Sequence, residues 1–161
     1  MFMRILAALG IALVMSACSA PKILTDQVGE GESLKNNKKV TLVISLENRD
    51  PKKLLTSDET KSVVSQTRAI FAEVFGRKGV AISELPEAGM PEVRIDYKWG
   101  KPGMIYLSGF SRPYDVDVTA SLRKNGKVLL ETTSWDMNDP TLYRMVEQII
   151  RKHAELFASK F

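Results

Sequence analysis

The sequence predicts an α+β domain in which two amphipathic helices pack on a single, mostly antiparallel sheet. Three observations carry this prediction. Short runs of alternating or β-branched residues recur along the chain, an Asn-Gly pair separates two of them, and two longer stretches carry apolar residues at helical spacing. The expected order is therefore strand, helix, strand, strand, hairpin and closing helix.

The first half of this domain is predicted as a strand, a helix and a short strand. Val40–Leu46 is rich in β-branched residues and places its aliphatic side chains alternately on one face. Thr56 and Glu59 then have the spacing of a capping box, which satisfies free amide groups at a helix start. We expect the helix to run to about Phe75 and the short strand to occupy Val80–Ser83.

The second half is predicted as antiparallel strands. Val93–Trp99 alternates cleanly between apolar and charged residues, which is typical of a half-buried strand of the antiparallel type. Tyr114–Arg123 and Lys127–Trp135 flank Asn125 and Gly126, a pair that suits the two-residue type I′ turn. These two runs should form a hairpin.

Counting back from that turn predicts the register of the hairpin. Leu122 should face Leu129, and Ala120 should face Glu131. The even-numbered residues of the first hairpin strand then form its core side. Glu131 would lie either near a sheet edge or beside a partner, and the sequence leaves both alternatives open.

The closing helix should begin with Asp139 as its N-cap and Pro140 in its first turn, where the missing amide costs nothing. Its apolar stripe continues almost to the C-terminus and includes the only histidine, His153. A single histidine can build neither a histidine-based metal cluster nor a Ser/His/Asp triad. We therefore expect His153 to be a hydrogen-bonded structural side chain rather than a catalytic one.

The N-terminal residues contain the one specific functional motif. A short basic start, the apolar run Ile5–Met15 and two small residues precede Cys18, the only cysteine. This is the order of the three regions of a secretory signal. The apolar run is shorter than the roughly 20 residues with which a helix crosses a bilayer. We therefore predict a cleaved signal peptide at residues 1–17.

Met15–Cys18 resembles the lipobox of bacterial lipoproteins. The resemblance implies that the peptide is cut before Cys18, that its thiol receives a diacylglycerol, and that its new amino group is acylated, typically with palmitate. In that class an Asp after the cysteine commonly signals retention in the inner membrane. Ser19 stands here, which implies an outer-membrane lipoprotein that faces the periplasm. The alternative is an ordinary secretory signal that leaves Cys18 as a free thiol or removes it.

Residues 18–39 are predicted to be the lipidated N-terminus and a flexible linker, because polar and turn-forming residues dominate without a sustained apolar period. A coil of roughly twenty residues has an end-to-end distance on the order of 25 Å. Ile23, Leu24 and Val28 leave room for a short ordered segment. We expect residues 40–161 to form a single domain without a disulfide, because Cys18 has no partner cysteine.

No catalytic residue, metal site or cofactor is predicted. The chain carries a net charge of +4, a modest excess that suits anionic lipid head groups or glycan phosphates. Nucleic acid is not an expected partner of an exported, lipid-anchored chain. An alternative function is that of a small-ligand carrier or an enzyme with an unrecognised cleft. In that case Asp115 and Asp117, which share a strand face, and Glu131 would matter.

Aromatic and basic residues gather between the third strand and the hairpin, and such residues are enriched where partners bind. The candidates for partner binding are Tyr97, Trp99, Tyr106, Phe110 and Arg112. The tryptophan could equally be a core residue. In layout, Val40–Phe157 resembles small uncharacterised proteobacterial lipoproteins, which implies a fold and a location but no reaction. We predict a non-catalytic binding or assembly module whose partner is an envelope protein or a glycan.

Overall fold

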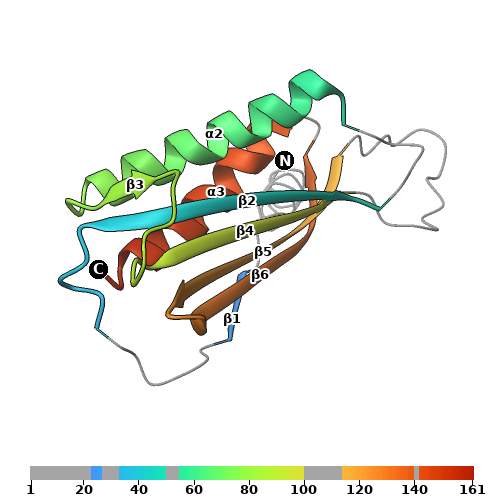
Figure 1. The fold of residues 1–161 in the computed structure, drawn as a ribbon. Helices are drawn as coiled ribbons and strands as arrows, with labels where there is room; N and C mark the ends of the chain where they lie inside the picture. The colour runs from blue at the N-terminus through green and yellow to red at the C-terminus, as the bar shows by residue number, and fades with distance from the viewer. Residues whose placement is uncertain (1–22, 27–32, 50–54, 100–113, 140–141) are drawn as a thin grey trace, which may run out of the picture.

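The computed structural model describes residues 23–26, 33–49, 55–99, 114–139 and 142–161. Within these ranges it contains two helices and six strands, and the α+β prediction is confirmed because both helices lie on one face of a single sheet (Figure 1). The elements are β1 (Ile23–Asp26), β2 (Lys39–Asn48), α2 (Ser57–Gly76), β3 (Ala81–Ser83), β4 (Glu92–Trp99), β5 (Tyr114–Lys124), β6 (Lys127–Asp139) and α3 (Leu142–Ala158).

The strands of the sheet lie in the order β1-β6-β5-β4-β2-β3. The pairs β1/β6, β6/β5 and β5/β4 are antiparallel, whereas β2 pairs in parallel with both β4 and β3. Parallel neighbours need a crossover connection, and α2 supplies it between β2 and β3. The predicted antiparallel pairing of β4 is thus present on the β5 side only, and the sheet is mixed.

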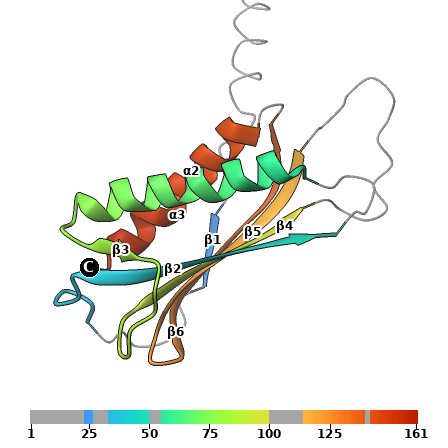
Figure 2. The same ribbon diagram turned by 45° about the horizontal axis from the view of Figure 1, so that its top comes forward.

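Different elements begin and end at the two ends of the sheet (Figure 2). At the end that we call the loop end, β2, β4 and β6 finish, β5 begins, and both helices start. At the opposite end, the hairpin end, Asn125 and Gly126 join β5 to β6 and both helices finish. The two helices therefore run in the same direction over the sheet.

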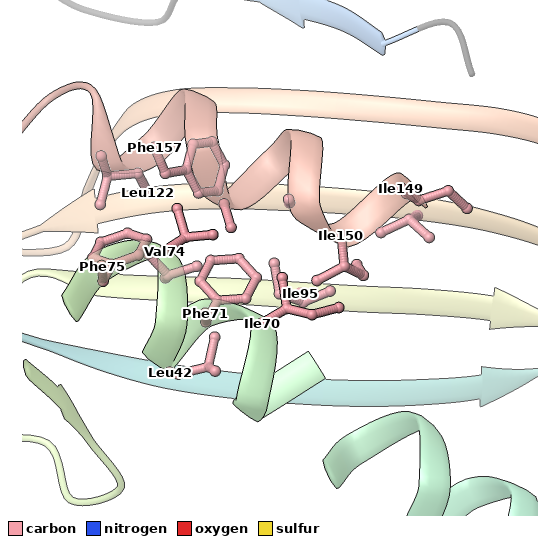
Figure 3. Packing of buried hydrophobic residues seen from close by; sticks show 14 of the residues in the cluster. Leu42, Ile70, Phe71, Val74, Phe75, Ile95, Leu122, Ile149, Ile150 and Phe157 are labelled. Carbon is pink, nitrogen blue, oxygen red and sulfur yellow. The ribbon is translucent and has the colours of Figure 1, made fainter. Parts of the chain in front are cut away.

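The core lies between the helices and the sheet. α2 packs over β2 and β3, α3 packs over β5 and β6, and the helices pack on each other. Figure 3 shows side chains of both helices meeting above Leu42, Ile95 and Leu122 of the sheet. Phe71, Phe75 and Phe157 are fully buried there, and each such ring stabilises the fold by about 2 to 3 kcal/mol relative to an exposed one.

The start of α2 confirms the predicted capping box. The Thr56 hydroxyl accepts a hydrogen bond from the Glu59 amide at 3.2 Å, and the Glu59 carboxylate accepts one from the Thr56 amide at 2.8 Å. Both bonds satisfy amide groups that have no partner within the helix. α2 ends at Gly76, one residue beyond the predicted Phe75.

The predicted register of the hairpin is wrong by one residue between Leu122 and Val118. Asn125 and Gly126 have the positive φ values of the expected turn, 51° and 77°. A register shift follows, so that Leu122 faces Leu130 instead of Leu129, and Ala120 faces Thr132 instead of Glu131. An inserted residue of this kind is a β-bulge, and a slip of one residue moves each later side chain to the opposite face.

The bulge decides which residues of β6 are buried. Leu130, Thr132 and Ser134 are at most 2% exposed and face the helices. Glu131 and Thr133 are half-buried on the other face of the sheet. Two hydroxyl groups thus enter the core where the expected register would have placed a carboxylate.

β1 extends the sheet beyond β6, with Ile23 opposite Ser134 and Asp26 opposite Glu131. It lies within residues 18–39, at the place where Ile23 and Leu24 left room for an ordered segment. Leu34, from the same range, is 2% exposed and belongs to the core. Ordered structure therefore extends into the predicted linker.

Neither helix within the described ranges is long and apolar enough to span a membrane.

Candidate functional site

The sequence-predicted site residues fall into two groups. Cys18, Tyr106, Phe110 and Arg112 lie outside the described residues. Tyr97 and Trp99 lie at the loop end of β4, on the face that packs against the helices.

Tyr97 and Trp99 are core residues, which corrects their assignment as partner-binding candidates. Their exposed fractions are 1% and 3%. Their rings stack with centroids 5.9 Å apart and an interplanar angle of 11°. The alternation of β4 places both on the helix side, so neither side chain offers a surface to a partner.

The Tyr97 phenol connects the sheet to α2. Its oxygen lies 2.5 Å from the Thr67 hydroxyl, which itself donates to the Val63 carbonyl at 2.7 Å. Because the Thr67 proton is engaged in that way, the phenol is the donor between the two. Burial raises the pKa of Tyr97, while the hydrogen bond with Thr67 opposes this. The phenol therefore stays protonated and neutral.

Trp99 has a different polar environment. Its indole Nε1 is buried and has no acceptor among the described residues. A buried donor without a partner costs about 1 to 3 kcal/mol. The stacked Tyr97 ring and the surrounding core therefore hold Trp99 by packing.

An ion pair crosses the loop end of the sheet. Arg49 donates to the Asp117 carboxylate at 2.9 Å, and the Arg49 amide donates to the Trp99 carbonyl at 2.8 Å. These contacts tie the end of β2 to β4 and β5, and we call them the loop-end clamp. The two side chains of the pair are 24% and 22% exposed.

The loop-end clamp bears on the alternative ligand-binding role of the acidic residues. The guanidinium of Arg49 neutralises Asp117, so this carboxylate already has a cation as its partner. The side chain of Asp115 lies outside the described part. Among the described residues, no group of three or more His, Cys, Asp or Glu side chains is placed to hold a metal ion.

The sheet face away from the helices is polar, and its charges are complementary. Glu92 of β4 is paired in register with Arg123 of β5, and Lys98 lies between Glu47 and Asp117. Opposite charges directly across a sheet stabilise it modestly. Glu131 lies on the same face, opposite Ser121. This pattern is typical of the polar outer face of a sheet.

His153 is the centre of the buried polar network under α3. Its Nδ1 lies 2.7 Å from the Thr132 hydroxyl and its Nε2 lies 3.1 Å from the Ser134 hydroxyl. These hydroxyls also lie 3.3 Å from the Ala120 carbonyl and 3.4 Å from the Val118 carbonyl. The prediction that His153 is hydrogen-bonded is confirmed, and its side chain lies in the core.

The geometry accounts for a neutral imidazole in either tautomer. One ring nitrogen donates to a hydroxyl, which in turn donates to a strand carbonyl, and the other ring nitrogen accepts from the second hydroxyl. His153 is fully buried. Burial lowers its pKa to about 4, because the charged form loses hydration.

Sequence reasoning missed the partners of His153. Thr132 and Ser134 alternate with Glu131 and Thr133, so either pair could face the core. The β-bulge determines which pair faces the core, and no local sequence pattern predicts the bulge. The one available signal was that His153 interrupts an apolar stripe, since a buried imidazole needs polar partners from the strand that it faces.

The sequence matches no protein-family model and no curated protein. Solved structures share the fold, and two of them are compared with this chain. A PelC dodecamer from Paraburkholderia phytofirmans aligns with a TM-score of 0.51 and 17% identity, covering 84% of this chain and 95% of that chain. A DUF4136 family protein from Bacteroides thetaiotaomicron aligns with a TM-score of 0.53 and 11% identity, covering 88% and 97%. At this identity the likeness is one of fold.

Proposed function

We propose that the chain is a lipid-anchored envelope lipoprotein whose domain is a non-catalytic binding or assembly module on the periplasmic side of the outer membrane. The anchor is the Cys18 side chain, and the support for it is the lipobox resemblance of Met15–Cys18. One acyl chain binds a membrane only marginally, whereas several chains on one residue hold it firmly, at about 0.8 kcal/mol per buried CH₂.

One observation carries the non-catalytic part of the proposal. Among the described residues, three side chains that could do chemistry are engaged in structural contacts: His153 with two hydroxyls, Tyr97 with Thr67, and Asp117 with Arg49. A general acid or base needs reach to a substrate proton and a pKa near the working pH. The buried imidazole and the buried phenol have neither.

The partner-binding segment that we propose is the connection from β4 to β5, which includes Tyr106, Phe110 and Arg112. The described residues support it indirectly. The buried Trp99 and the loop-end clamp fix the strand ends between which this connection runs. Aromatic and arginine side chains presented on a fixed base suit recognition of an envelope protein or a glycan.

A second copy of this chain is one candidate protein partner, because the PelC neighbour is a dodecamer. The mass of the purified chain in solution, measured by light scattering, decides whether copies assemble. A monomer at all concentrations would exclude self-assembly and leave another envelope component as the partner.

The anchor is tested with Cys18→Ser. This variant should fold normally but lose metabolic labelling with a fatty acid and leave the membrane fraction. Circular dichroism and urea unfolding of the variant serve as controls for folding. A variant that is still labelled would contradict the proposed anchor.

Partner binding is tested by replacing Tyr106, Phe110 and Arg112 together with Ala. Crosslinking in native membranes followed by purification should recover the partner with the natural chain and lose it with this variant. The matched control replaces three exposed residues toward the hairpin end, Lys78, Leu85 and Lys127, with Ala. Equal recovery with both variants would contradict the site.

A further inference from the structure

We propose that the domain is held with its loop end toward the membrane by a short tether between Cys18 and β1. This inference rests on the proposed lipid anchor and adds to it the orientation of the domain relative to the lipid head groups. It follows from the register of β1 and from the number of residues that separate β1 from Cys18.

The register gives the direction from which the chain enters the sheet. Ile23 lies opposite Ser134, and β1 runs antiparallel to β6. β6 proceeds from Lys127 at the hairpin end to Asp139 at the loop end. The chain that precedes Ile23 therefore approaches from the loop-end side of Ser134.

The chain length limits how far the anchor can lie from β1. Cys18 precedes Ile23 by five residues, and five residues span at most about 17 Å when fully extended. This is less than the end-to-end distance of about 25 Å expected for a free linker of roughly twenty residues. With β1 docked on β6, even the fully extended tether is thus shorter than the average span of the free linker.

The hairpin end lies beyond that reach. From Ser134 back to Gly126 the strand covers eight residues, which is about 27 Å at 3.4 Å per residue. A tether of at most about 17 Å cannot double back over this distance. If the tether continues from Ile23 toward the loop end, it reaches as far as the end of β6. The loop end is consequently the end that can meet the head groups.

The orientation can be measured with two matched labels. Cys18 is the only cysteine, so acylation leaves no free thiol in the natural chain. Lys61→Cys and Lys78→Cys each introduce one thiol at an exposed position, one near the start of α2 and one just past its end. Between position 61 and the end of α2 at Gly76 the helix axis measures about 22 Å.

The experiment uses the full lipidated chain, labelled with a fluorescent maleimide and reconstituted in phosphatidylethanolamine/phosphatidylglycerol vesicles that carry a head-group quencher. We expect the label at position 61 to be quenched at least about twofold more than the label at position 78, given their separation along α2. Equal quenching, or stronger quenching at position 78, would overturn the inference.

A spacer variant isolates the role of the tether. Inserting about 20 Gly and Ser residues after Ser19 lengthens the tether as a flexible coil. The difference between the two labels should then shrink, and an unchanged difference would overturn the tether as its cause. Fatty-acid labelling is measured on the same samples. Its absence counts against the lipid anchor, whereas labelled protein with the wrong quenching pattern counts against the orientation alone.

Discussion

Two buried polar contacts join the sheet to its two helices, and they differ in how they respond to acid. Under α2, the Tyr97 phenol donates to Thr67. Under α3, the His153 imidazole lies between Thr132 and Ser134. The phenol is neutral at any pH at which the protein works, whereas an imidazole gains a proton in mild acid once it leaves the core. The contact of His153 under α3 should therefore weaken in acid, whereas the contact of Tyr97 under α2 should not.

The largest effect is expected for His153→Ala. The change removes a fully buried ring that packs near Phe157 and leaves two hydroxyls facing a cavity. Cavity formation together with lost hydrogen bonds should lower the free energy of unfolding by about 3 to 4 kcal/mol. Urea denaturation measures it. A loss no greater than that of Tyr97→Phe would remove the contrast between the two contacts.

Acid should destabilise the natural chain through His153. Its pKa falls from the ordinary 6.5 to about 4 in the folded state. Between these values the unfolded state binds a proton that the folded state does not, so stability falls as the pH falls. Below about pH 4 the loss levels off at about 3 kcal/mol. Urea denaturation at intervals from pH 7 to pH 4 measures this slope.

His153→Gln is the control for the pH series, because its amide can still donate and accept but does not titrate. The variant should lose less stability between pH 7 and pH 4 than the natural chain. If both lose the same amount, other groups cause the acid response. Glu73 is one such group, since its hydrogen bond with Arg151 lowers its pKa.

A smaller effect is expected for Tyr97→Phe. The ring and its stacking on Trp99 remain, and Thr67 still donates to Val63. The lost hydrogen bond should cost about 1 kcal/mol, with no change in the slope between pH 7 and pH 4. A double-mutant cycle with Thr67→Val measures the coupling. No coupling would mean that packing alone docks α2.

The smallest effect is expected at the contact between the two helices themselves. Glu73 of α2 accepts two hydrogen bonds from Arg151 of α3, both at 3.1 Å, in an exposed position. Glu73→Gln should lower the melting temperature slightly at low salt, and the difference should vanish at high salt because solvent ions screen exposed pairs. A persistent difference at high salt would indicate a packing role.

Local patterns predicted local structure well. The spacing of Thr56 and Glu59 predicted the start of α2, and the Asn125-Gly126 pair predicted a turn with positive φ values. The alternation of Val93–Trp99 predicted which side chains of β4 share the buried face. Each of these features depends on residues a few positions apart, where propensity and hydrogen bonding act directly.

Features that depend on distant segments were not predictable in the same way. Nothing in the sequence of β4 indicates that β2 is its parallel neighbour. The β-bulge reverses the faces of Thr132 and Glu131 without a local signal, and only the bulge explains the partners of His153. Tyr97 and Trp99 have the composition of a binding surface, yet the coverage of one sheet face by both helices makes them core residues.

The pairing of β1 with β6 also bears on the order in which the strands pair during folding. Among the described strands β1 is the first in sequence and β6 the last, so β1 has no strand to pair with until β6 has formed. Contacts between the two ends of a chain form late because loop closure must precede them. A chain anchored at Cys18 would therefore fold while its anchor segment is still long and flexible. The pairing of β1 with β6 would then shorten this segment and bring the domain close to the membrane.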